Sequence, residues 1–344
     1  MSLFIFSSLS RAHGEPLVSG RVKHCPEDFL VDELMPVDFS GDGEHLWIRV
    51  QKLGCNTDWL AQAIAKAAGL KASAVSYAGL KDRHAITTQW FSLHLPGLPD
   101  PDLTVLDSDE VKILKSVRHN RKLKRGALSG NCFKLRIRDL IGDVTSLDER
   151  LQAISEQGVP NYFGEQRFGF EMSNIDKALA MFQGQLRRLK KNKRSLFLSA
   201  ARSWIFNQVL SQRVRDGNWN NRLAGDAFML AGKSACFVDD ASENLVQRLS
   251  SREIHPTGPL WGKGESMAAL DCAELETTIA SDNAALAEGL ENAGLKQERR
   301  ALRLMPENMQ WTLQDSTTLN LEFCLPSGAY ATMVLREFMD QEVA

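Results

Sequence analysis

Three strand-like segments follow one another in the chain with no helical pattern between them. Apolar or aromatic residues alternate with polar ones in "ITTQWFSLHL" (86–95), "EVKILKSVRHN" (110–120) and "NCFKLRIRDL" (131–140). Such alternation is typical of strands with one buried face. Parallel neighbours need a long crossover, usually a helix, whereas antiparallel neighbours need only a short turn. The segments therefore predict an antiparallel or mixed sheet rather than a doubly wound parallel one.

Two further strands and a helix are predicted ahead of these segments. Residues 28–34 and 45–54 have strand composition and are separated by the glycine-rich turn "SGDGE". Residues 56–69 predict a helix, because a capping residue precedes it and Gly69 ends it. Leu60 and Ile64 lie about one turn apart in this helix, so we expect them on its buried face.

The middle of the chain differs in character from both ends. From about Pro160 the patterns are mostly helical, and residues 310–339 return to strand alternation before a short helix. Since 344 residues are long for a single core, two domains are expected. The predicted fold class is α+β: a mixed or antiparallel sheet with flanking helices, completed by both ends of the chain, and an inserted α+β domain.

Composition indicates an ordinary globular protein, with 43% hydrophobic and 24% charged residues. No apolar run approaches the ~20 residues that span a bilayer, and the start "MSLFIFSSLSRAHGEP" lacks the features of a secretory signal. We therefore expect a cytoplasmic protein. The six cysteines are scattered without a Cys-x-x-Cys pair, which predicts reduced thiols, and the seven histidines are equally dispersed. We expect no metal site.

Charge is segregated along the chain although the net charge is only −2. Basic residues gather at 118–125 ("RHNRKLKR"), 187–194 ("RRLKKNKR") and 297–303 ("QERRALR"), while acidic ones gather at 98–110. Any single basic run can be an ordinary solvated face. Three such runs together favour a polyanionic partner.

The stretch "AGLKDRHAITTQWF" (78–91) places Lys81, Asp82, Arg83 and His84 in succession after a glycine. A carboxylate is ionised at neutral pH and stays so when a cation lies close to it. In an extended segment the side chains of Lys81 and Arg83 point away from that of Asp82, so the cation can come from another strand. On composition alone, a turn followed by an edge strand is favoured over a catalytic aspartate.

The same stretch resembles the signature of the TruD family of tRNA pseudouridine synthases, which reads Gly-x-Lys-Asp-(two residues)-Ala-x-Thr-x-Gln. Four more blocks are similar to family motifs and occur in the family's order: "GRVKHCPEDFLVDEL", "LKRGALSGNCFKLRIRDL", "GVPNYFGEQRFG" and "LPSGAYATMVLREFM". Together they reach from about residue 20 to residue 340. The block at 160–169 opens the family's inserted domain. The resemblance implies a catalytic domain at 1–155 and 305–344, with a TRUD domain at 156–304.

The resemblance also implies a reaction. Family members convert uridine to pseudouridine in tRNA without a cofactor, and the expected site is position 13 in the D arm. Asp82 falls on the family's nucleophile, which attacks the ribose C1′ or the ring C6, and Lys23 falls on the basic residue that pairs with it. Such covalent catalysis divides one difficult step into two easier ones.

Further positions follow from the same resemblance. A uridine pocket requires an aromatic face and a polar partner for the base edge. Phe29, Asn131 and Phe133 match family positions that line this pocket, whereas Tyr330 stands where phenylalanine is common. His84 is assigned no role. We expect Lys81 and Arg83 either to contact RNA or to brace the loop. RNA contacts are also expected of Arg187, Arg188, Lys190 and Lys191.

Two other classes of function stay open on the sequence. One is an RNA-binding or RNA-chaperone protein that keeps the fold without catalysis, although retention of both Lys23 and Asp82 argues against it. The other is a hydrolase of a different glycosidic bond, which would need a second carboxylate that no motif supplies. The only partner expected is tRNA, and a monomer is expected.

Overall fold

The computed structural model describes residues 4–186, 188–240 and 244–341, which form two compact units. Unit 1 contains the chain up to Pro16, Glu149–Met305 and Ala329–Phe338. Unit 2 contains Leu17–Asp148, Pro306–Gly328 and the chain from Met339 onward. The units are thus drawn from more segments than the three predicted domain ranges, and the domain assignment stays a prediction.

Unit 2 is built on one ten-stranded sheet, in which the order of the main path is β14-β15-β7-β2-β5-β3-β6. β1 pairs with β7 and β16, and β4 pairs with β5. β2 lies parallel to β5 and β1 parallel to β16, while the other pairs are antiparallel. The predicted mixed sheet is confirmed. The strands are β1 (Val18–Arg21), β2 (Phe29–Leu34), β3 (His45–Lys52), β4 (Val75–Tyr77), β5 (Ile86–His94), β6 (Val111–His119), β7 (Gly130–Gly142), β14 (Glu307–Asp315), β15 (Thr318–Pro326) and β16 (Met339–Gln341).

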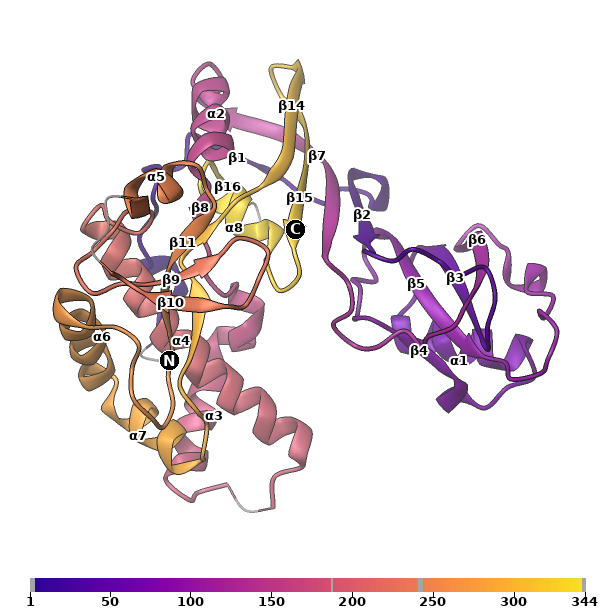
Figure 1. Cartoon of the computed structure of the whole chain (residues 1–344). Helices are drawn as coiled ribbons and strands as arrows, with labels where there is room; N and C mark the ends of the chain where they lie inside the picture. The colour runs from indigo at the N-terminus through magenta and orange to yellow at the C-terminus, as the bar shows by residue number, and fades with distance from the viewer. Residues whose placement is uncertain (1–3, 187, 241–243, 342–344) are drawn as a thin grey trace. The chain divides into compact units, whose positions relative to one another are not determined.

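The long strand β7 joins the early and late parts of the chain into this sheet (Figure 1). On one side it pairs with β2, and on the other with β15, which follows almost two hundred residues later. The two ends of the chain therefore complete one sheet, as predicted from the return of alternation near residue 310.

Helix α1 (Thr57–Ala67) covers one face of the β3–β5 region. Leu60 and Ile64 are buried in it against Ile48 and Phe91, as the helical spacing predicts. This packing fixes the start of α1 beside the loop that leads into β5, which positions the site described below.

Unit 1 is the helix-rich part of the chain, and α4 (Lys191–Arg215) packs against α3, α6, α7 and β11 in it (Figure 1). Trp204 is buried in its core, as predicted. The buried Arg213 guanidinium makes a two-point ion pair with Asp226, at 2.7 and 3.0 Å. The other elements are α2 (Leu147–Gln157), α3 (Ser173–Phe182), α5 (Asn244–Ser250), α6 (Leu270–Asp282), α7 (Ala284–Asn292), α8 (Ala331–Arg336), β8 (Val159–Pro160), β9 (Ala227–Leu230), β10 (Cys236–Val238), β11 (Ile254–Leu260), β12 (Glu298–Ala301) and β13 (Arg303–Leu304).

Six short 3-10 helices complete the described structure. They are Phe6–Ser8, Pro26–Asp28, Ala72–Ala74, Thr104–Leu106, Glu165–Phe168 and Phe170–Met172.

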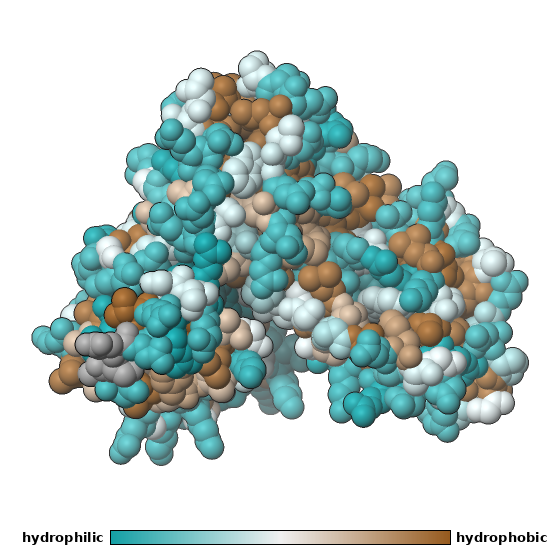
Figure 2. All heavy atoms as spheres, turned by 45° about the horizontal axis from the view of Figure 1, so that its top comes forward, coloured by the Kyte–Doolittle hydropathy of each residue, from teal (hydrophilic) through white to brown (hydrophobic). Residues whose placement is uncertain are grey.

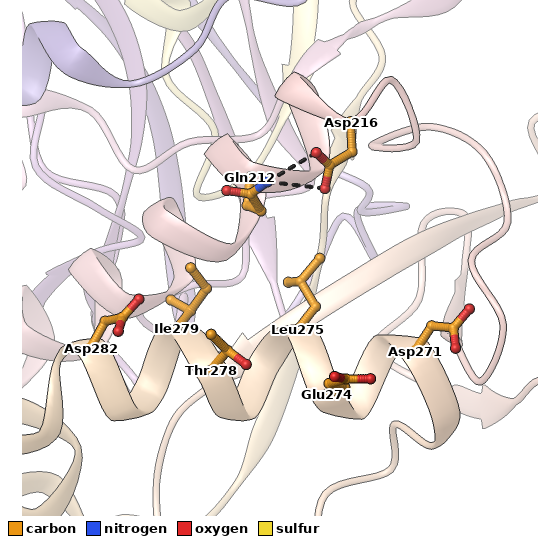
Figure 3. Close-up of a pocket in the computed structure, with 8 residues that line it drawn as sticks. All are labelled: Gln212, Asp216, Asp271, Glu274, Leu275, Thr278, Ile279 and Asp282. Carbon is orange, nitrogen blue, oxygen red and sulfur yellow. Dashed lines mark hydrogen bonds between the residues drawn. The ribbon is translucent and has the colours of Figure 1, made fainter.

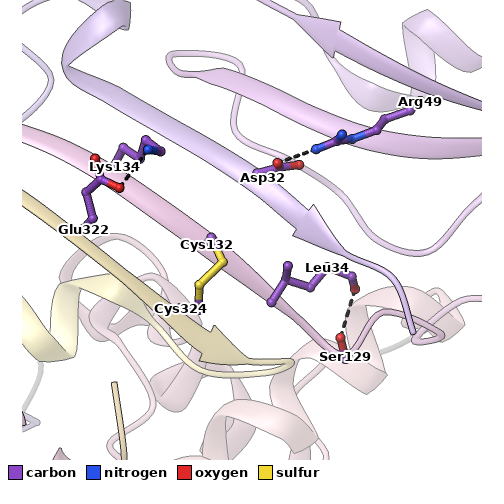
Figure 4. The surroundings of a disulfide bond; sticks show 8 residues. All are labelled: Asp32, Leu34, Arg49, Ser129, Cys132, Lys134, Glu322 and Cys324. Carbon is purple, nitrogen blue, oxygen red and sulfur yellow. Dashed lines mark hydrogen bonds and ion pairs between the residues drawn. A yellow bond between two sulfur atoms is a disulfide. The ribbon is translucent and has the colours of Figure 1, made fainter. Parts of the chain in front are cut away.

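One disulfide corrects the expectation that all cysteines are reduced. Cys132 on β7 and Cys324 on β15 are register partners and form a disulfide (Figure 4). The remaining four, Cys25, Cys55, Cys236 and Cys272, are free. The sequence does not reveal the pair because 192 residues separate its members, and only the sheet brings them together.

The surface is mainly hydrophilic on the face drawn in Figure 2, where hydrophobic residues form scattered patches. Among the described residues, none of the helices is both long enough and apolar enough to cross a membrane.

Candidate active site

The candidate site is built around the loop between β4 and β5, which carries Asp82. Two buried side chains hold this loop. Lys52, at the end of β3, donates hydrogen bonds to the backbone carbonyls of Cys55 (2.8 Å) and Asp82 (3.1 Å). Gln89, on β5, bonds to the Thr57 hydroxyl (3.0 Å) and donates to the Gly79 carbonyl (3.5 Å).

The Asp82 carboxylate is presented at the surface, with its side chain 38% exposed. Lys23 donates a hydrogen bond to one of its oxygens and forms an ion pair with it. The other oxygen accepts a hydrogen bond from the backbone N–H of His84 (2.9 Å), so the side chain also closes its own turn. Partial burial favours the neutral acid, but the Lys23 ammonium and this N–H outweigh it and lower the pKa of Asp82. The group is a carboxylate throughout the neutral range.

Lys23 reaches Asp82 from a turn that follows β1. Its backbone is left-handed, with φ of 64°, a conformation uncommon outside glycine. Its ammonium lies 4.4 Å from the centre of the Phe29 ring. The turn is anchored by buried Asp28, whose two carboxylate oxygens accept hydrogen bonds from Arg138, both at 2.8 Å.

Three of the expected pocket residues share one face of the sheet. On the antiparallel pair β2–β7, Glu33 lies opposite Asn131, Val31 opposite Phe133, and Phe29 opposite Leu135. Since side chains alternate between faces, Phe29, Asn131 and Phe133 all project to the same side. The rings of Phe29 and Phe133 are 6.2 Å apart and meet edge to face, at 77°. Lys23 lies over the Phe29 ring and is paired with Asp82, so it links this face to the Asp82 carboxylate.

Lys81 does not have the exposure expected of an RNA contact. Its side chain is 8% exposed and forms an ion pair at 3.0 Å with Glu33, which is fully buried. It also donates a hydrogen bond to Asn131 Oδ1 (2.6 Å). The ammonium is used inside the protein, because a carboxylate and an amide oxygen lie within reach of it, which fits the alternative that Lys81 braces the loop.

The other expected RNA contacts lie at the surface where the structure describes them. Arg83 is exposed in the Asp82 loop, and Arg188, Lys190 and Lys191 are exposed before and at the start of α4. Arg187 lies outside the described residues. Tyr330 belongs to unit 1, where its hydroxyl accepts a hydrogen bond from Arg167 (2.8 Å).

Two residues of this neighbourhood, Glu33 and Lys52, were not singled out from the sequence, whereas Gln89 is the glutamine that ends the Asp82 signature. A signal for Lys52 was present, since Leu46, Ile48 and Val50 precede it at alternate positions of β3 and are all buried. A lysine that continues an inward-facing series is expected to have a specific internal partner. Glu33 continues the series of Phe29 and Val31 on β2 in the same way.

Two cavities differ in charge. One in unit 1, about 330 Å³ in volume, is lined by Asp216, Asp271, Glu274 and Asp282 between the end of α4 and α6 (Figure 3). Carboxylates repel phosphate, so this cavity is unsuited to RNA. The other, in unit 2, has a volume of about 520 Å³ and includes Lys122, Lys124 and Arg125 of the basic run at 118–125 in its wall.

A family model described as tRNA pseudouridine synthase D (TruD) matches residues 10–179 and 172–338 of the chain. The chain belongs to the TruD family. Curated tRNA pseudouridine synthase D proteins from Hydrogenovibrio crunogenus and Methylococcus capsulatus are 49% and 47% identical to this TruD-family chain. The first alignment covers 97% of this chain and 96% of the relative, and the second covers 97% and 95%.

The fold agrees with this membership. A crystal structure of a TruD protein from Methanosarcina mazei matches 96% of this chain and 95% of its own, with a TM-score of 0.73 at 20% identity. As a TruD-family member, the chain is a tRNA pseudouridine synthase, an isomerase that converts uridine to pseudouridine in tRNA. The alternatives of a binding-only protein and of a glycosidic hydrolase are set aside.

Proposed function

We propose that this enzyme forms pseudouridine at position 13, in the D arm of tRNA, with Asp82 as the nucleophile. The observation that carries the proposal is the ionised Asp82 carboxylate, which is paired with Lys23 beside a face that holds Phe29, Phe133 and Asn131. A flipped uridine requires this combination of an anionic nucleophile, an aromatic surface and a polar group for its edge.

The reaction needs no net addition of atoms. Asp82 attacks the ribose C1′ or the ring C6, and the bond between N1 and C1′ breaks. The uracil turns while it is held, C5 bonds to C1′, and the bond to Asp82 is released. The proton on C5 is lost, and N1 gains one. Lys23 has two roles in this scheme: it keeps Asp82 ionised and it fixes the direction of the carboxylate.

The pocket residues act by holding the base. Phe133 and Phe29 offer aromatic surface to the uracil, and Asn131 meets a polar edge of it. Tyr330 supplies a further aromatic ring for the substrate. The exposed Arg83, Arg188, Lys190 and Lys191, with Arg187, contact phosphates, which position the RNA without reading its sequence.

Replacement of the nucleophile tests this proposal. Asp82→Asn should abolish pseudouridine formation on unmodified tRNA, mapped chemically at each position, and leave tRNA affinity nearly unchanged. Asp32→Asn is a matched control, because Asp32 is a half-exposed, ion-paired carboxylate on β2 of the same sheet. An active Asp82→Asn enzyme would overturn the assignment of the nucleophile, and product at another position would overturn the choice of position 13.

We further propose that the enzyme acts as a cytoplasmic monomer without a protein partner or a cofactor. Light scattering of the purified protein, alone and with tRNA, gives the oligomeric state. A stable dimer under assay conditions would contradict the proposal.

A further inference from the structure

On the same face of the sheet as the pocket residues lies an ion pair that the reaction scheme above does not use. Lys81 and Glu33 meet at 3.0 Å, with side chains 8% and 0% exposed. Glu33 is held from behind, since its second oxygen accepts a hydrogen bond from the backbone N–H of Trp90 (2.9 Å). The backbone N–H of Lys81 is itself bonded to the Thr57 hydroxyl (3.0 Å). Both partners are thus fixed by separate elements.

This pair is linked to the pocket by a hydrogen bond that Lys81 donates to Asn131 Oδ1 at 2.6 Å. Glu33 and Asn131 are register partners on β2 and β7, so one ammonium reaches both side chains. An ammonium can only donate hydrogen bonds. The amide of Asn131 must therefore turn its oxygen toward Lys81 and its NH₂ group away from it. In the described part of the chain no protein group accepts a hydrogen bond from this NH₂.

We propose that Lys81, braced by Glu33, is a positioning residue that presents the Asn131 NH₂ as a fixed hydrogen-bond donor to a uracil carbonyl oxygen, which in the docked base is that at C4. The proposal rests on the function above in one respect, namely that Asn131 lines the pocket for the target base. Beyond that function, Lys81 and Glu33 set the direction in which the Asn131 amide points.

A fixed donor suits the rotation of uracil in particular. The ring carries a carbonyl at C2 and another at C4, on either side of the axis through N3 and C6. A half-turn about this axis exchanges N1 with C5 and also exchanges the two carbonyls. One immobile NH₂ group therefore faces a carbonyl oxygen both before and after the turn.

Cytosine lacks this property, because it carries an amino donor in place of the C4 carbonyl. In one of its two orientations that amino group meets the Asn131 NH₂, and two donors are left without an acceptor. A site built to hydrogen-bond its substrate discriminates strongly against an analogue that cannot complete the bond. The fixed amide is thus a determinant of specificity for uridine over cytidine.

The experiment removes the ion pair as a unit, so that no buried charge is left alone. In Lys81→Met/Glu33→Gln the amide of Asn131 can turn, and we expect kcat to fall about 10- to 100-fold with little change in tRNA affinity. The decisive readout is the ratio of inhibition constants of two tRNA transcripts, one with uridine and one with cytidine at the target position. This preference for uridine should shrink by about 10-fold or more.

The matched control is Lys134→Met/Glu322→Gln, which removes an exposed ion pair (2.7 Å) between β7 and β15. It should retain both the wild-type kcat and the wild-type preference for uridine. A folded Lys81→Met/Glu33→Gln protein with a wild-type preference overturns the proposal. If the double variant keeps the wild-type preference and Asp82→Asn is inactive in the same assays, the positioning role of Lys81 is overturned but the proposed function is not.

A second measurement covers the case in which the double variant does not fold. In wild-type protein with ¹⁵N-labelled asparagine, the side-chain signals of Asn131 are identified by their loss in Asn131→Ser. They should shift on binding tRNA with uridine at the target position. Unchanged signals in the presence of bound tRNA overturn the proposal.

Discussion

The charge of Asp82 is set by residues that are remote in sequence. Its immediate neighbours Lys81 and Arg83 do not neutralise it, because Lys81 is engaged with Glu33 and Arg83 is exposed. The cation comes instead from Lys23, on a left-handed turn 59 residues earlier. Local sequence shows which residues can ionise, but the fold decides which of them meet.

Removal of Lys23 should therefore move the acid limb of the pH–rate profile. Burial alone raises the pKa of Asp82, and Lys23 is the main group that lowers it. In the proposed reaction the reactive form of Asp82 is the carboxylate, so wild-type activity should be lost only as pH falls through a value below the ordinary 3.8. In Lys23→Met this limb should shift to higher pH. The stability that the ionised group contributes in the wild type, which is lost at the same acidic pH, should be reduced as well.

Single-turnover rates between pH 3 and 7, with circular dichroism to confirm folding, give this comparison. Lys112→Met, an exposed lysine on β6, is the control and should leave the limb in place. A limb at the same pH in Lys23→Met and wild type would contradict the role of Lys23.

A second prediction at this scale concerns Lys52. Burial lowers the pKa of its ammonium, whose hydrogen-bond partners within the described ranges are backbone carbonyl oxygens. Lys52→Met keeps the length of the side chain but releases the Asp82 loop. A displacement of about 1 Å at a nucleophile costs up to about 100-fold in rate. We expect kcat to fall by about 10- to 100-fold with an unchanged tRNA dissociation constant, measured against Lys112→Met. A wild-type kcat would show that Lys52 is not needed to place Asp82.

At the scale of elements, the sequence predicts what has a regular apolar period and misses what does not. Helix α1 and strand β7 were predicted because each buries one regular face, whereas β5, which was also predicted, is buried on both faces. Helix α6 was missed, since its buried positions are Cys272, Glu276 and Ala280. The spacing is helical, but Glu276 is charged and is stabilised by Arg299 at 2.7 and 2.8 Å. The buried face of α6 can be recognised only when the position of β12, which carries Arg299, is known.

In the candidate site, too, some residues were predicted from the sequence and others were missed. Asp82, Lys23 and the pocket residues were predicted from ordered motifs, whereas Glu33 and Lys52 could have been predicted from charge at inward-facing strand positions. The disulfide could not have been found by either route. It depends on the register of β7 against β15, which no local pattern specifies.

The disulfide between β7 and β15 predicts how many thiols react before and after reduction. Unfolded under non-reducing conditions, the protein should expose four reactive thiols, and six after reduction. Cys132→Ser should expose five without a reductant, because Cys324 is then freed, and should be less stable by about 2–4 kcal/mol. Titration with a thiol reagent in denaturant checks the counts, and six thiols before reduction would exclude the disulfide.

At the scale of the whole molecule, the distribution of charge matters more than its sum. Although the net charge is −2, acidic and basic groups lie apart, as in the acidic cavity beside α6 and the exposed basic residues at the start of α4. In the proposed function, such basic residues bind the tRNA phosphates. Each phosphate neutralised by a basic residue releases counterions and steepens the salt dependence of binding.

The triple change of Arg188, Lys190 and Lys191 to glutamine should therefore weaken tRNA binding at low salt and flatten its salt dependence. The slope of log K against log salt should fall by about 0.7–0.9 for each phosphate that the variant no longer neutralises. The control changes three exposed basic residues elsewhere in unit 1 to glutamine: Lys233, Arg252 and Lys263. Fluorescence anisotropy at several salt concentrations supplies the slopes. Equal slopes in the wild type and the first variant would remove this run from the RNA surface.

The two compact units are not consecutive stretches of chain. The polypeptide passes between them five times, and each unit includes a segment that follows residue 328: Ala329–Phe338 in unit 1, and the chain from Met339 in unit 2. On a ribosome, many proteins fold one domain at a time as the nascent chain emerges. Here the units cannot be completed one after the other, because unit 1 includes α8 and unit 2 includes β16, which follow residue 328. Each unit therefore stays incomplete until its late segment has been translated.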